Sequence, residues 1–98
     1  MRDFTSVCPH TQGYIMQGIY MAFEKATRTL EEGNTNLANF FFEKIVQKLQ
    51  SLAGTRLLSE NNARIIAQEL IVKIQEMNLK FSKTTIGALE EVTNLISS

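Results

Sequence analysis

Cysteine, proline and histidine each occur only once in this chain of 98 residues, and tryptophan is absent. Because a lone cysteine, Cys8, cannot close an intramolecular disulfide, packing must hold the fold, and we expect a reducing compartment. The single proline, Pro9, precedes every helical pattern in the chain, so no proline interrupts a later helix. The composition thus excludes a fold stapled by disulfides and permits long helices.

Long apolar runs and an excess of either charge are also lacking. No segment approaches the ~20 apolar residues that span a bilayer, and the first residues lack the apolar stretch of a signal peptide. Ten basic and ten acidic side chains give a formal net charge of zero, whereas nucleic-acid-binding proteins usually carry a basic excess. We therefore expect a soluble, cytoplasmic protein without a membrane partner, and the charge balance argues against nucleic acid.

The chain instead contains four segments in which apolar residues recur every three or four positions, the spacing of one helix face. Alternation with a period of two never persists, so strands are not expected. The joints between the segments are short, which favours antiparallel neighbours. We predict a single all-α domain over residues 1–98, an antiparallel four-helix bundle with residues 1–10 flexible. Its helices are expected at about 12–32, 36–53, 60–78 and 83–96.

Residues at the joints predict where these helices begin and end. Gly33 and Gly54 follow the first two segments, and glycine commonly ends a helix because it adopts the left-handed conformation at little cost. Ser59 and Ser82 precede the last two segments and are expected to be N-caps. Phe81, just before the second of these caps, is expected to pack against the first turn of the last helix.

Three of the predicted helices carry large apolar side chains on a second face, away from the expected core. In the third helix, Ile65, Val72 and Leu79 stand seven residues apart, opposite the inner face. Tyr20 in the first helix and Phe40 in the second stand beside polar residues in a similar way. Because large exposed apolar patches usually mark interaction sites, we predict a protein-binding surface made by these five residues. A second copy of the chain, in a homodimer, is the expected partner.

The residues that support catalysis or metal binding do not occur in the necessary combinations. Cys8 and His10 flank Pro9, but a structural zinc site needs four ligands and the chain has no other cysteine or histidine. The glutamates form no Glu-x-x-His pair of a di-iron bundle, and no glycine-rich phosphate loop occurs. We therefore expect a non-catalytic interaction or regulatory protein with no metal, no cofactor and no small-molecule ligand.

Two alternative functions remain open from the sequence. The stretch 43–96 resembles the helical part of an ATP-cone regulatory domain, because the segments 43–45, 63–74 and 82–89 follow that family's order of helix, helix and Ile-Gly-helix. This resemblance implies a nucleotide-sensing regulatory domain, although the family's basic, glycine-containing hairpin is replaced here by the first helix. The other alternative is a DNA-binding regulator with a helix-turn-helix in the last two helices, where Glu90 and Glu91 would oppose phosphate.

Overall fold

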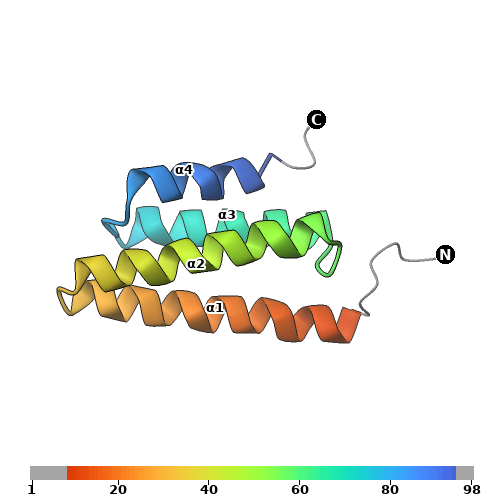
Figure 1. Cartoon of the computed structure of the whole chain (residues 1–98), viewed down its shortest axis with the longest axis horizontal. Coiled ribbons are helices and arrows are strands. Elements are labelled where there is room, and N and C mark those ends of the chain that lie inside the picture. Colours follow the sequence, from red (N-terminus) through yellow and green to blue (C-terminus); the bar gives the residue numbers. More distant parts are fainter. Residues whose placement is uncertain (1–8, 95–98) are drawn as a thin grey trace.

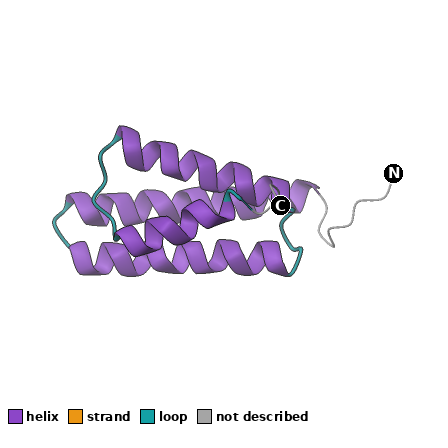
Figure 2. Cartoon of the chain, turned by 90° about the horizontal axis from the view of Figure 1, so that it is seen from above, coloured by secondary structure: helices purple, strands orange, loops and turns teal. Residues whose placement is uncertain are grey.

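The computed structural model describes residues 9–94, and all the regular secondary structure in that range is helical. Consecutive helices run in opposite directions (Figure 1) and are joined by short loops (Figure 2). The predicted all-α class is therefore confirmed for the described part of the chain. The helices are α1 (Pro9–Glu31), α2 (Thr35–Gly54), α3 (Glu60–Glu76) and α4 (Lys83–Val92).

Helices α2 and α3 lie at the centre of the arrangement. Each packs against the three other helices, whereas α1 packs against α2 and α3 only. The short α4 lies over α2 and α3 and does not reach α1, so the first and last helices are not neighbours as they are in a regular square bundle. As a result, α1 and the adjoining side of α2 keep a wide surface that no other described helix covers.

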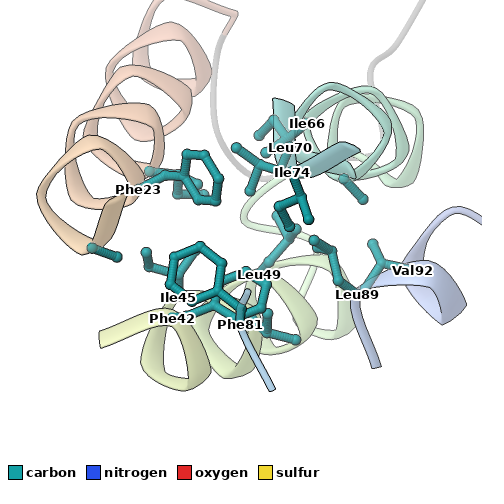
Figure 3. Packing of buried hydrophobic residues seen from close by; sticks show 14 of the residues in the cluster. Phe23, Phe42, Ile45, Leu49, Ile66, Leu70, Ile74, Phe81, Leu89 and Val92 are labelled. Carbon is teal, nitrogen blue, oxygen red and sulfur yellow. The ribbon is translucent and has the colours of Figure 1, made fainter. Parts of the chain in front are cut away.

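Aromatic and branched side chains from all four helices fill the core (Figure 3). The ring of Phe42 from α2 stacks on that of Phe81 with 4.4 Å between centroids, and Phe23 from α1 lies 6.2 Å and 6.0 Å from these two rings. Phe81 belongs to the α3–α4 connection, so this short segment is itself part of the core. Figure 3 also shows aliphatic side chains of the same core: Ile45, Leu49, Ile66, Leu70, Ile74, Leu89 and Val92.

Two of the predicted helix boundaries are confirmed in detail. The Ser59 hydroxyl accepts a hydrogen bond from the backbone N–H of Asn62 at 3.1 Å, as expected for the N-cap of α3. Gly33 adopts a φ of 91° after α1, in the left-handed region. Gly54, in contrast, is the last residue of α2, and the left-handed residue is Arg56, with a φ of 63°. The helix therefore ends one residue later than expected, and the left-handed position lies at Arg56, two residues beyond the expected Gly54.

Leu79 does not lie on the outer face of α3, as its spacing from Val72 predicted. The helix ends at Glu76, and Asn78 adopts a φ of 55°, which turns the chain. The N–H of Leu79 then donates to the carbonyl of Ile74 at 2.9 Å, the bond typical of a Schellman motif. This turn carries the Leu79 side chain into the core, where only 8% of its surface is exposed.

The beginning of α1 is tied to the beginning of α3. Gln12 is buried, and its Oε1 accepts hydrogen bonds from the N–H of Ser59 at 3.2 Å and from Nδ2 of Asn62 at 2.7 Å. Pro9 and His10 form the first residues of α1, although we expected a flexible segment up to residue 10; proline is well tolerated at the first position of a helix. Cys8 lies outside the described residues.

Candidate functional site

The five residues predicted to form an interface do not share one surface. Ile65 and Val72 lie on the outward side of α3, and Tyr20 of α1 joins them through a hydrogen bond to Glu69. Phe40 belongs instead to the outer side of α2, where 51% of its surface is exposed. With Leu79 in the core, the structure brings three of the five residues together, and it offers two separate surfaces.

The first surface is the outward side of α3, which we name the α3 ridge. Val72 is 46% exposed and Ile65 is half-buried, and seven residues of helix separate them by about 10.5 Å. Both signs of charge stand beside these apolar side chains. The ridge therefore combines an apolar strip with mixed polar groups: Ile65, Gln68, Glu69, Val72, Lys73 and Glu76.

Tyr20 fixes one of the charged groups of the ridge. Its hydroxyl donates to Oε1 of Glu69, so α1 holds this carboxylate at the edge of α3. Burial of the phenol raises the pKa of Tyr20 above its ordinary value of 10.0, and the hydrogen bond and the negative charge of Glu69 raise it further. Tyr20 is therefore a neutral donor around pH 7, and one oxygen of the carboxylate remains for other partners.

The second surface is a groove between α1 and α2, which we name the α1–α2 groove. It is open to solvent with a volume of about 260 Å³, and its floor is apolar, formed by Ala22 of α1 and by Phe41 and Ile45 of α2. Three lysines surround this floor. Exposed apolar side chains also stand one helical turn before residues of the groove: Met21 before Lys25 on α1, and Leu37 before Phe41 and Phe40 before Lys44 on α2. The rim lysines are Lys25, Lys44 and Lys48.

Aromatic faces, and not carboxylates, lie against two of the rim lysines. Nζ of Lys25 lies 5.0 Å from the centroid of the Phe41 ring, and Nζ of Lys44 lies 5.3 Å from that of Phe40. Such cation–π contacts hold an ammonium group near the surface without neutralising it. In the part of the chain that the structure describes, no ion pair neutralises Lys25, Lys44 or Lys48. The groove is therefore apolar at its base and positive at its rim.

The sequence held a signal for this groove that periodicity alone did not reveal. Lys44 and Lys48 are one turn apart on α2, next to the aromatic run that ends in Phe42. Lys25 stands in a different helix, and only the packing of α1 against α2 brings it to the same rim. The apolar floor could not be predicted from the sequence, because its residues come from two different helices.

The described residues 9–94 contain no cluster of three or more side chains of the types that ligate metals. Within the same range, no helix combines the length and the apolar character needed to cross a bilayer. His10 packs edge-on against Tyr14, with 5.5 Å between ring centroids.

Comparison with protein-family models, with curated proteins and with solved structures gives no match to this chain.

Proposed function

We propose that this chain is a non-catalytic interaction protein that self-associates through the α3 ridge. One observation carries the proposal: the apolar strip of Ile65 and Val72 is accessible on a helix whose inner face is fully used by the core. Burying such a strip against a second copy removes apolar surface from water, which favours association.

The charges of the ridge support pairing between identical copies. In a two-fold interface the contacts are reciprocal: if residue i of one copy contacts residue j of the other, residue j of the first copy contacts residue i of the second. If two α3 helices cross antiparallel with the two-fold axis at the level of residue 71, beside Val72, Glu69 of each copy lies opposite Lys73 of the other. The charges then alternate in sign across the interface, which favours this register over others. The Tyr20 hydroxyl would hold Glu69 in place for this contact.

The expected association is weak. The ridge belongs to one helix of 17 residues, which is about 25 Å long. Two such helices bury less than the ~1,200 Å² at which stable specific interfaces begin. We therefore expect a monomer–dimer equilibrium with a dissociation constant in the micromolar to millimolar range, about 1 µM to 1 mM.

Sedimentation equilibrium over a dilution series that begins near 1 mM tests this proposal. The wild-type mass should rise toward that of a dimer with concentration. Val72→Glu should remain monomeric because it buries an unpaired carboxylate at the centre of the contact. Met21→Glu is the matched control, since Met21 is 60% exposed on α1 and lies outside the ridge. Far-UV circular dichroism verifies that both variants keep their helices.

A charge exchange tests the register as well as the surface. Lys73→Glu alone should weaken association, because it leaves Glu69 opposite another carboxylate. The double variant Glu69→Lys/Lys73→Glu should restore most of it, since the two signs again alternate. A wild-type chain that stays monomeric at every concentration would refute self-association. Equal dimerisation of Val72→Glu and the wild type would place the interface elsewhere.

A further inference from the structure

We infer that the α1–α2 groove is a docking site for an acidic amphipathic helix supplied by a different protein. The groove uses none of the residues of the α3 ridge, so this binding does not depend on self-association. The inference rests on the shape of the groove, on its apolar floor and on the charge of its rim.

The size and depth of the groove suit side chains of a partner helix. Its volume of about 260 Å³ is below the ~300–1,000 Å³ usual for drug-sized ligands. The floor of Ala22, Phe41 and Ile45 runs along two adjacent helices, so successive apolar side chains of a third helix can enter it. Helices recognised in this way present anchors at positions i, i+3 or i+4, and i+7. The exposed Leu37, Phe40 and Met21 provide further apolar contact outside the recess.

The rim selects the charge of the partner. Lys25 and Lys44 contact aromatic rings, and in the described part of the chain no carboxylate pairs with them or with Lys48. A helix with glutamates or aspartates beside its apolar stripe would neutralise all three. The cation–π contacts also restrict the motion of two of these lysines, which lowers the entropic cost of pairing them.

A second copy of this chain suits the groove less well. Two-fold pairing of one groove with another would place three lysines opposite three lysines, and like charges directly opposed are unfavourable. An anionic membrane uses less of the groove, because the apolar floor is recessed between two helices and only side chains outside the recess, such as Phe40, could insert into a flat bilayer surface. These two occupants are therefore outcomes that the experiment must distinguish.

The direct test is titration of the ¹⁵N-labelled full chain with a synthetic amphipathic helical peptide of about five turns. The peptide carries leucines at helix spacing with flanking glutamates, and the control peptide has lysine at each glutamate position. We expect amide shift changes centred on Ala22, Phe41 and Ile45, and binding that weakens as salt screens the rim. The lysine peptide should bind at least about tenfold more weakly, a difference of about 1.4 kcal/mol.

Two variants locate the binding. Lys44→Glu/Lys48→Glu should reduce affinity for the glutamate peptide about tenfold or more, while Lys80→Glu/Lys83→Glu, with the same change in net charge outside the groove, should change it little. Ala22→Phe should block binding without harm to the core, because the exposed Ala22 side chain borders the recess that the new ring would fill. Val72→Glu should bind the peptide normally, which separates this result from the fate of the α3 ridge.

Other outcomes overturn the inference. Equal affinity for the two peptides, or shifts outside the groove, would remove the acidic helix as its occupant. Lysine-dependent binding to phosphatidylserine vesicles, without binding to the glutamate peptide, would assign the groove to a lipid surface. Loss of self-association in Lys44→Glu/Lys48→Glu would assign it to a second copy of the chain.

Discussion

Phe81 offers a quantitative test of the packing, because it lies outside every helix and still belongs to the core. It is 4% exposed, and its ring stacks on Phe42 with 4.4 Å between centroids. Substitution by alanine removes nearly all of this contact. Phe40 provides a matched control, since the same residue type is 51% exposed on the outer side of α2.

The expected cost of Phe81→Ala is about 4 kcal/mol. A fully buried phenylalanine removes roughly 150–250 Å² from water, which at ~25 cal/mol per Å² gives about 4–6 kcal/mol as an upper estimate. Measured Phe→Ala changes in cores cost about 3–5 kcal/mol. Phe81→Leu keeps most of the apolar volume and loses the ring stacking, so it should cost about 1–1.5 kcal/mol. Phe40→Ala should cost less than about 1 kcal/mol.

Urea unfolding followed by circular dichroism at low protein concentration measures these differences. With an m-value of about 1–1.5 kcal/mol/M, Phe81→Ala should lower the midpoint by about 3 M, or leave the chain unfolded in buffer. Phe81→Leu stays within the measurable range in either case. Equal midpoints for Phe81→Ala and Phe40→Ala would refute the conclusion that the α3–α4 connection is part of the core.

Two further predictions concern α1. The buried Oγ1 of Thr27 has no hydrogen-bond partner among the described residues, so Thr27→Val should raise the free energy of unfolding by about 1 kcal/mol. Thr29→Val should not, because the Thr29 hydroxyl donates to the carbonyl of Lys25 at 2.8 Å; a gain at both positions would contradict this explanation. Burial and the contact with Glu69 raise the pKa of Tyr20, so the folded chain favours the neutral phenol. The stability linked to this neutral form is fully present below pH 10.0, the ordinary pKa of tyrosine, and is lost as the pH rises above that value. Thermal unfolding from pH 8 to about 11.5 should therefore show a steeper loss for the wild type than for Tyr20→Phe, and parallel curves would count against a raised pKa.

The pattern of apolar spacing and of capping residues was enough to predict the helices. The caps depend on contacts within a few residues, which is why Ser59 and Gly33 could be assigned from the sequence. Arg56 shows the limit of such rules, because a non-glycine residue takes the left-handed conformation although Gly54 is two residues away. The intrinsic preference of glycine for the left-handed conformation does not decide which residue adopts it here, because the chain after the turn must also bring Leu58 into the core.

The candidate surfaces were predictable only in part. Val72 and Phe40 are exposed, as their positions on the helices predicted, because the core-facing stripe of a helix determines its opposite face. The prediction that Leu79 is exposed was wrong, because seven-residue spacing places two side chains on one face only while the helix continues, and α3 ends at Glu76. The hydrogen bond between Tyr20 and Glu69 joins positions 49 residues apart and carries no local signal.

The sequence by itself determined that this chain forms four helices, where most of them begin and end, and which stripe of each helix faces inward, because these properties depend on periodicity and on nearby residues. Only the tertiary structure decided which helices are neighbours. The packing of α1 beside α2, with α4 on the other side of the core, brings Lys25 to the rim shared with Lys44 and Lys48. The α1–α2 groove thus depends on long-range packing, which no spacing along the chain encodes.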